Sequence, residues 1–233
     1  MKQSKKFKEK SKLVDRTKHY DPAEAVDLLK KISYSNFNES VELHFNLGID
    51  PKHADQQLRG TVSLPKGIGK NKKVLVIAEG DDVKRAEENG ADYVGSDDYI
   101  EKIQGGWFDF DVVISTPALM KKIGKLGKVL GAKGLMPNPK LGTVTKDIEK
   151  AVKEFKSGKF EYRNDKNGII HMIIGNTSFS EADLVTNFNY IYDFLNKIKP
   201  NKAKGTYFKS IALCSTQSPS IFIEPLKIKW KEN

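Results

Sequence analysis

The chain has 233 residues, of which 38% are hydrophobic, and it carries a formal net charge of +10 at pH 7. These values suffice for one large domain or two modest ones, and the basic excess favours a polyanionic partner, nucleic acid before an anionic membrane surface. A single cysteine excludes an internal disulfide and suits a reducing cytoplasm, and no apolar run reaches the ~18 residues that a membrane span requires.

The first fifty residues combine a basic terminus, a helix and an amphipathic strand. Residues 1–12 contain six lysines. This composition fits either a solvated terminus or an arm that becomes ordered on RNA. A helix is predicted from Pro22 to Ile32, with Asp21 as its N-cap. Apolar residues at every second position from Val41 to Ile49 then predict a strand with one face on a core and one face free.

The middle of the chain has a different pattern of predicted strands and helices. A strand at 60–64 is followed by a stretch rich in Pro, Gly and Lys, residues 64–70, which predicts a first crossing between two domains. The apolar run at 74–78 is typical of a strand covered on both faces. Strands and helices then alternate up to a helix that begins at Ile148, so we expect parallel strands in a three-layer α/β domain. Residues 157–159 are the expected second crossing.

After residue 159 the sequence again predicts mainly strands and turns, as it does near the beginning of the chain. Two strands, 160–163 and 169–174, surround a loop rich in Asn, Asp and Gly, and they are predicted to pair as a hairpin. Ser180 is predicted to cap a long helix with one apolar face, and strands at 206–214 and 220–223 close the chain. This similarity between the two ends of the chain suggests one domain interrupted by another.

Charge is strongly segregated within the middle domain. From Glu79 to Asp111 acidic residues outnumber basic ones by eight, whereas the segment from Val112 to Lys146 has seven lysines and no acid. We interpret this as a domain with an acidic face and a basic face, the basic one turned to phosphate. The alternative is a coincidence of charges that serve helix dipoles and solubility.

The basic segment includes an unusual stretch, residues 124–143, with the sequence GKLGKVLGAKGLMPNPKLGT. It has five glycines, four lysines and no acid. Apolar side chains such as Leu126, Val129 and Leu130 are expected to anchor it to a core. Composition alone fits either a basic surface loop or a platform that a polyanion approaches closely, because glycine lacks a Cβ and lysine supplies the field.

No catalytic, cofactor or metal site is predicted. A dinucleotide fold needs a glycine fingerprint after its first strand, but Glu79-Gly80-Asp81-Asp82 stands there and would repel phosphate. Four histidines without metal-ligand spacing and one cysteine do not make a zinc site. Cys214 lies in an apolar strand and is expected in the core. A nucleotide-dependent α/β enzyme is therefore the disfavoured alternative.

Several motifs besides the 124–143 stretch are specific in residue order: LGIDP at 47–51, RGTVSLP at 59–65, GADYVG at 90–95, RNDK at 163–166, and Ser215-Thr216 before Pro219-Ser220. In this order, and over nearly the whole chain, they resemble bacterial members of the ribosomal protein L-one family. The resemblance implies that residues 1–66 and 159–233 form a discontinuous α+β RNA-binding domain. Residues 67–158 would then form an inserted, Rossmann-like α/β domain.

The same resemblance implies a non-enzymatic constituent of the large ribosomal subunit. Members of the family bind the stalk region of large-subunit rRNA and help to release deacylated tRNA from the exit site. Bacterial members can also repress translation of their own mRNA. The expected partners are therefore stalk rRNA, exit-site tRNA and the chain's own mRNA leader, with no cofactor, no membrane and a monomer off the ribosome.

The family's RNA-binding residues correspond to ten positions here: Phe37, Ser40, Glu42, Arg163, Asp165, Gly168, His171, Ser210, Thr216 and Ser218. Hydroxyls and carboxylates suit 2′-hydroxyls and base edges, and the aromatic ring suits a ribose or base, although a strand carboxylate is often merely solvated. A secondary RNA or tRNA contact is expected at Lys125, Lys128, Lys133 and Lys140. Two departures from the family are Gln217-Ser218 in place of Met-Gly and Asn36 in place of a common lysine.

Overall fold

The computed structural model describes residues 4–225, so the tail at 226–233 lies outside it. The described chain groups into two compact units. The terminal unit comprises the residues up to 59, residues 64–69 and the residues from 162 onward, and the central unit comprises residues 60–63 and 70–161. These bounds differ by a few residues from the predicted division, because 67–69 belong to the terminal unit, whereas 60–63 and 159–161 belong to the central one. That the units are independent domains stays a prediction.

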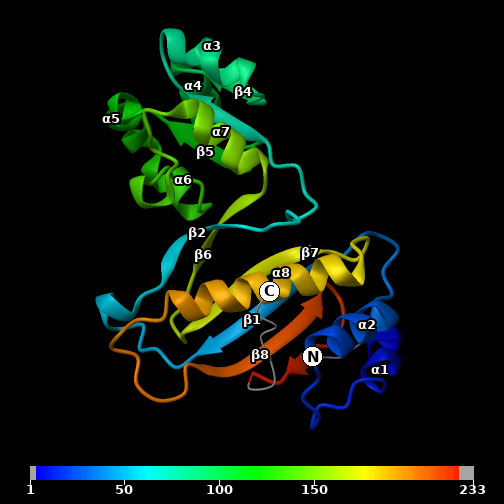
Figure 1. Ribbon diagram of the computed structural model, residues 1–233. Coiled ribbons are helices and arrows are strands. Elements are labelled where there is room, and N and C mark those ends of the chain that lie inside the picture. The colour runs from blue at the N-terminus through cyan, green and yellow to red at the C-terminus, as the bar shows by residue number, and fades with distance from the viewer. Residues whose placement is uncertain (1–3, 226–233) are drawn as a thin grey trace. The chain divides into compact units, whose positions relative to one another are not determined.

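The terminal unit is built on a four-stranded antiparallel sheet with the strand order β7-β1-β8-β9 (Figure 1). Its strands are β1 (Ser40–Leu47), β7 (Ile169–Asn176), β8 (Phe208–Ser215) and β9 (Ile221–Ile223). Because β1 pairs with both β7 and β8, the sheet brings together residues from the beginning and the end of the sequence.

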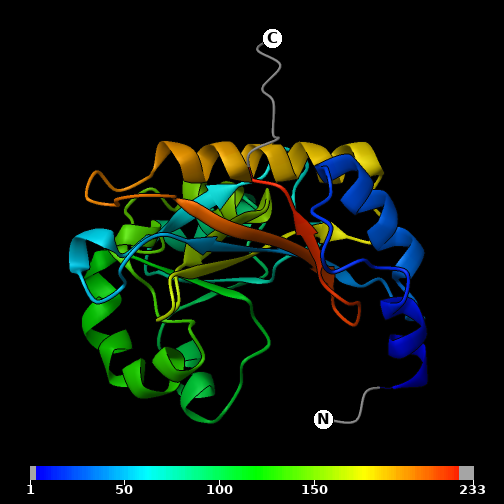
Figure 2. The ribbon, with the colours of Figure 1, turned by 90° about the horizontal axis from the view of Figure 1, so that it is seen from below.

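Two helices cover one face of this sheet, and Figure 2 shows them on the same side of it. They are α2 (Pro22–Ile32), as predicted, and α8 (Glu181–Lys197). Along β1 the odd-numbered residues from Val41 to Leu47 are buried, and the even-numbered ones are partly exposed. This alternation confirms the prediction, since successive side chains of a strand point to opposite faces. The sheet therefore has a buried face under the helices and an open face.

The helix starts follow the capping rules in part. Ser180 Oγ accepts a hydrogen bond from Asp183 N at 3.1 Å and caps α8 as predicted. Asp21 has the backbone conformation of an N-cap at α2, but its side chain makes no cap hydrogen bond. Glu24, in the first turn of α2, forms an ion pair with Lys18. The basic terminus contains a short helix, α1 (Lys5–Ser11).

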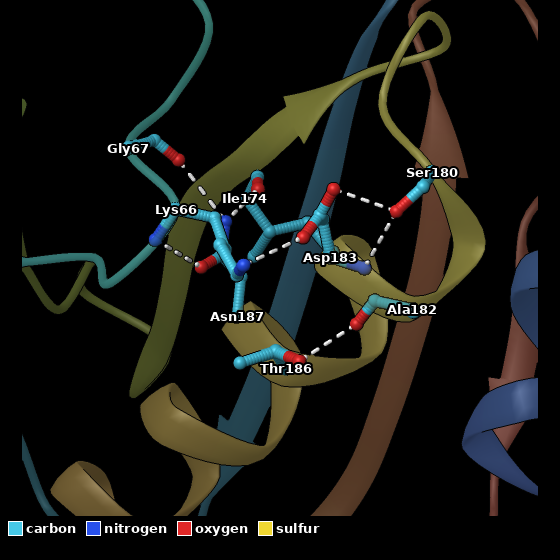
Figure 3. Close-up of polar contacts among 8 residues, drawn as sticks. All are labelled: Lys66, Gly67, Ile174, Ser180, Ala182, Asp183, Thr186 and Asn187. Atoms are coloured by element: carbon cyan, nitrogen blue, oxygen red, sulfur yellow. Dashed lines mark hydrogen bonds and ion pairs between the residues drawn. The ribbon is translucent and has the colours of Figure 1, made fainter.

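A buried amide holds the chain against the terminal unit just before it enters the central unit (Figure 3). Asn187 of α8 is fully buried, and its Nδ2 donates to Gly67 O at 3.0 Å and to Ile174 O at 2.7 Å. Its Oδ1 accepts a hydrogen bond from Lys66 N at 3.2 Å. These bonds anchor residues 66 and 67 in the terminal unit. The terminal unit therefore extends beyond residue 66, where the predicted boundary lies.

The central unit contains a three-stranded parallel sheet with the strand order β4-β3-β5. Its strands are β3 (Val74–Ile77), β4 (Tyr93–Gly95) and β5 (Val112–Ser115). One apolar cluster packs the sheet against α4 (Asp97–Gln104), α5 (Met120–Ile123) and α6 (Gly127–Ala132), and another packs it against α3 (Asp81–Glu88) and α7 (Ile148–Lys156). Parallel strands between two helical layers are thus confirmed.

The predicted hairpin between 160–163 and 169–174 is confirmed only at its loop, where Asn164 and Ile170 form an antiparallel bridge and Asp165 N donates to Ile169 O at 2.8 Å. β6 (Lys159–Arg163) pairs with β2 (Arg59–Ser63), whereas β7 pairs with β1. Asn164 explains the difference, because its N donates to Leu58 O at 3.0 Å and its Oδ1 accepts from Leu58 N at 2.7 Å. A turn-rich composition predicts that the chain bends, but not which strand becomes the partner.

Candidate nucleic-acid interface

The open face of the terminal sheet collects residues from separate parts of the sequence. Four of the ten implied RNA-binding residues lie on it, none of them buried: Ser40, Glu42, His171 and Ser210. They belong to β1, β7 and β8, and the antiparallel register places them in neighbouring cross-strand rows. Side chains on one face of paired strands contact their cross-strand neighbours, so these four positions form one surface.

A row of polar contacts crosses the centre of this face. His44 Nδ1 lies 2.7 Å from His171 Nδ1, and His44 Nε2 lies 3.1 Å from Cys214 Sγ. Asp165 Oδ2 lies 3.8 Å from His171 Nε2. The two facing Nδ1 atoms share a single proton, because two N–H groups would repel each other at that distance. Burial and the neighbouring His171 lower the pKa of His44, against the opposing effect of Glu42.

The prediction that Cys214 packs in the core is wrong. Its side chain is partly exposed on the open face of the sheet. The apolar composition of the strand did not show which of its residues face the core. Burial raises the pKa of the Cys214 thiol to about 11. The thiol is therefore protonated at neutral pH and serves as a weak hydrogen-bond donor rather than as a nucleophile.

The turn after β8 is held to the start of β1 by hydroxyl groups. Thr216 Oγ1 accepts a hydrogen bond from Ser40 N at 3.1 Å. Ser218 Oγ accepts one from Ser215 N at 2.8 Å and lies 3.1 Å from Pro219 O, to which it donates. The implied RNA-binding hydroxyls therefore also shape the turn, and Thr216 Oγ1 acts there as an acceptor. No non-glycine residue in the described chain has a positive φ, so Ser218 needs no glycine conformation.

A buried carboxylate joins this turn to the loop that carries Phe37. Glu39 is fully buried, and its carboxylate accepts hydrogen bonds from Ser35 N at 3.1 Å, from Gln217 N at 3.4 Å and from Ser215 Oγ. Burial alone would raise the pKa of Glu39, but these hydrogen bonds together lower it. Ser35 Oγ also donates to Gln217 Oε1 at 3.0 Å, a bond that a methionine at 217 does not offer. The loop and the turn are thus one connected unit.

Apolar groups border the polar row. Phe37 leaves 54% of its surface exposed, and Ile173, on the open face of β7, leaves 37%. Single exposed apolar residues are common, but an aromatic ring next to hydrogen-bonding groups matches the way in which proteins stack on unpaired bases. Phe37 is thus an exposed ring on a loop that Glu39 ties to Ser215 and Gln217, the two neighbours of Thr216.

The other implied residues lie in the loop between β6 and β7 or beside it. Asp165 Oδ1 accepts hydrogen bonds from Asn167 N and Ile169 N, both at 2.8 Å. Gly168 has a φ of +81°, and a Cβ there would lie 3.3 Å from a backbone oxygen of β1, so glycine is required. These two residues shape the loop. Arg163, at the end of β6, and Lys166, in the loop, are exposed cations of this segment.

Sequence reasoning missed residues of this interface. His44 and Asn46 were not among the ten implied positions. The alternation along β1 nevertheless indicated that both lie on the free face, so this signal could have identified them. Ile173 lies on the open face as well. Glu39 and Gln217 support the interface by joining the Phe37 loop to the turn after β8. No sequence signal marks them, because a single acid in a polar loop is normally solvated.

The implied secondary contact belongs to the central unit. Four lysines of the 124–143 stretch are exposed there: Lys125, Lys128, Lys133 and Lys140. Leu126 and Leu130 anchor the stretch in the core as expected, whereas Val129 is 40% exposed rather than buried. The basic segment also meets the acidic one, since Lys122 Nζ lies 3.0 Å from Glu79 Oε1 and 2.9 Å from Asp97 Oδ2.

Within residues 4–225, no group of three or more His, Cys, Asp or Glu side chains is arranged to hold a metal ion. In the same range, no helix has both the length and the apolar character that a bilayer span requires.

A comparison with models of protein families matches residues 29–219 to the ribosomal protein L1p/L10e family. The matched region includes all ten implied RNA-binding positions and the four lysines of the secondary contact. The family comprises ribosomal proteins that bind rRNA of the large subunit, and ribosomal proteins are generally not enzymes. Since the match spans most of its length, the chain belongs to the ribosomal protein L1p/L10e family.

Proposed function

We propose that this protein is a bacterial-type stalk protein of the cytoplasmic ribosome, which binds stalk rRNA and helps to release deacylated tRNA from the exit site. Family membership establishes a ribosome-associated protein of the large subunit that binds rRNA. The observation that carries the more specific proposal is the convergence of Ser40, Glu42, His171 and Ser210 on one open sheet face.

The chemistry of this face suits folded RNA better than a generic polyanion. At its centre His44 contacts both His171 and Cys214, with Glu42 beside them, and no row of lysines runs through the described residues there. A carboxylate repels phosphate, but it accepts hydrogen bonds from 2′-hydroxyls and base amino groups. Lysines elsewhere on the protein supply the phosphate contacts, which add affinity without sequence preference.

We propose that the terminal unit is the discontinuous RNA-binding domain and that the central unit is an inserted domain that makes the secondary contact. Two glycines of α6 support the proposed secondary contact of the central unit. Gly127 and Gly131 have no atom within 4 Å of an added Cβ, so neither packing nor a positive φ requires glycine there. A glycine inside a helix costs ~0.5–1 kcal/mol relative to alanine. Close approach of an RNA or tRNA backbone beside Lys125 and Lys128 would account for accepting that cost.

We also propose that the protein represses translation of its own mRNA. A leader that folds like the stalk would present the same hydroxyls and bases to the same open face. The two RNAs would then compete for a single site. An unlabelled leader fragment should displace a labelled stalk fragment fully, and simultaneous binding of both would refute the shared site.

A matched pair of aromatic substitutions tests rRNA binding. Phe37→Ala removes an exposed ring at the proposed interface, and Tyr190→Ala removes a ring that is 43% exposed on α8, the helix on the other side of the sheet. Loss of base stacking should cost ~1–3 kcal/mol in affinity for a stalk fragment, with an unchanged salt dependence because no charge is removed. Tyr190→Ala should leave the affinity unaltered. Equal effects of both variants, or none from Phe37→Ala, would refute the assigned face.

The exit-site role needs its own measurement. Ribosomes that carry the double variant Lys125→Gln and Lys128→Gln should release deacylated tRNA from the exit site at an altered rate, while their content of this protein stays normal. Dissociation of fluorescent tRNA from purified ribosomes measures this rate. An unchanged rate would remove the tRNA role and leave the rRNA result intact.

A further inference from the structure

The terminal unit contains an open groove of about 1060 Å³ that the candidate interface does not include. One wall is the segment from Gly48 to Gln56, after β1, and the other is the segment from Asn201 to Lys209, which leads into β8. The groove is far larger than a single phosphate group, so its dimensions suit an extended ligand.

Backbone and side-chain contacts fix the two walls. Gly48 N donates to Tyr207 O at 2.6 Å, and a Cβ on Gly48 would overlap the carbonyl oxygen of Thr206. An ion pair between Lys202 and Asp55 joins the walls directly. The groove is therefore part of the folded unit rather than a gap between loose loops.

The charges of the groove leave a basic excess. The lining holds three lysines against two carboxylates, Asp55 paired with Lys202 and Asp50 with its Oδ2 3.7 Å from His53 Nε2. Lys204 and Lys209, by contrast, are exposed and have no carboxylate partner within residues 4–225. A net positive charge in a concave surface attracts an anion more strongly than the same charge on a convex one.

The groove is continuous with the open face of the sheet. Asn46 pairs with Ser210 and Leu47 with Phe208, so Lys209 between them is the unpaired residue of a β-bulge. Bulges change the direction of a side chain, and Lys209 lines the groove while Ser210 lies on the open face. The opposite wall also meets the interface, because Ile49 Cγ1 lies 3.3 Å from the position of an added Cβ on Gly168.

We propose that this groove binds the sugar-phosphate backbone of the same RNA where it extends beyond the open face, with Lys204 and Lys209 contacting its phosphates. This inference rests on the proposed rRNA binding and lengthens its footprint. Backbone contacts position an RNA without reading its sequence, so the groove adds affinity and orientation, and the open face supplies specificity.

The test compares the full-length double variant Lys204→Gln and Lys209→Gln with a control that removes the same charge elsewhere. The control is Lys31→Gln with Lys197→Gln, on the helices that cover the other face of the sheet. Affinity for a stalk rRNA fragment is measured over a range of salt concentrations. The groove variant should flatten the slope of log affinity against log salt by roughly 0.7–0.9 per lysine, and the control should not. Hydroxyl-radical footprinting should show lost protection only at the margin of the protected region.

A second variant shifts affinity in the opposite direction. Asp55→Asn removes a negative charge from the groove and releases Lys202, so stalk RNA should bind more tightly. If the wild type discriminates stalk RNA from an unrelated duplex while all these variants behave like the control, the groove proposal is overturned and the proposed function stands. If the wild type itself does not discriminate, both proposals fall. Flattened salt slopes with an unchanged footprint would show general charge attraction and would also overturn the groove.

Discussion

Among single residues, Glu39 connects stability with binding most directly. It is fully buried, and it receives hydrogen bonds from both the Phe37 loop and the turn after β8. Glu39→Gln places an amide N–H₂ among these donors, and one buried donor loses its partner. We expect the free energy of unfolding to fall by about 1–3 kcal/mol in a urea titration, with weaker stalk RNA binding and an unchanged salt slope. Glu24→Gln, which removes an exposed ion pair with Lys18, is the control and should change little.

The pH dependence of this variant has a defined sign. The pKa of Glu39 is lowered in the folded protein, so its contribution is fully present above the pKa of the unfolded chain, about 4.3. That contribution is lost as the pH falls through the folded value. The difference between the wild type and Glu39→Gln should therefore shrink below about pH 4, and a constant difference would contradict the assignment.

His44 should affect stability in a higher pH range. Its pKa is lowered in the folded protein, mainly by burial and by His171, so below about pH 6.5 the unfolded chain binds more protons. The free energy of unfolding should fall as the pH drops from 7 to 5, and His44→Gln should reduce that fall. Glu42, Asp165 and Cys214 are the other titratable groups of this cluster. Urea titrations at each pH measure the effect, and equal slopes for wild type and variant would exclude it.

At the scale of elements, α6 offers a test of whether its glycines serve stability or contact. Gly127→Ala and Gly131→Ala should each raise the unfolding free energy by about 0.5–1 kcal/mol, because alanine is the better helix former and the space is open. Gly134→Ala should do the opposite, since Gly134 has a φ of +71°. The same two stabilising changes should weaken the secondary RNA or tRNA contact. Stabilisation without any loss of that contact would mean that no partner approaches this helix closely.

At the scale of the whole molecule, the division into units predicts a separable fragment. Residues 1–69 joined to 162–233 through a short glycine linker should fold and keep most specific affinity for stalk RNA. A second fragment, 1–66 joined to 159–233, loses Gly67 O, which accepts a hydrogen bond from buried Asn187 Nδ2. It should be less stable by about 1–3 kcal/mol in a thermal or urea titration. Equal stability would contradict the anchoring role of Asn187, and an unfolded first fragment would contradict the two-domain proposal.

The sequence alone determined which side of a strand is buried and which class of partner to expect. Side chains alternate along a strand with a period of two, so Val41 to Leu47 indicated the open face of β1 directly. The unbroken apolar run at 74–78 indicated a strand covered on both faces for the same reason. The ordered motifs identified the family and with it the rRNA, because the matching segments carry their chemistry in local residue order.

Only the tertiary structure decided which segments meet. Periodicity carries no information about a strand's partner, so the pairing of β6 with β2 was not predicted, and Cys214 was assigned to the core although it lies beside His44. The burial of Glu39 depends on donors from residue 35 and from residues 215–217, and the groove depends on walls at 48–56 and 201–209. Contacts between residues more than 140 positions apart follow from sheet register and helix packing. Hydrogen bonds and charge pairs act over a few ångströms in space, whatever the separation along the chain.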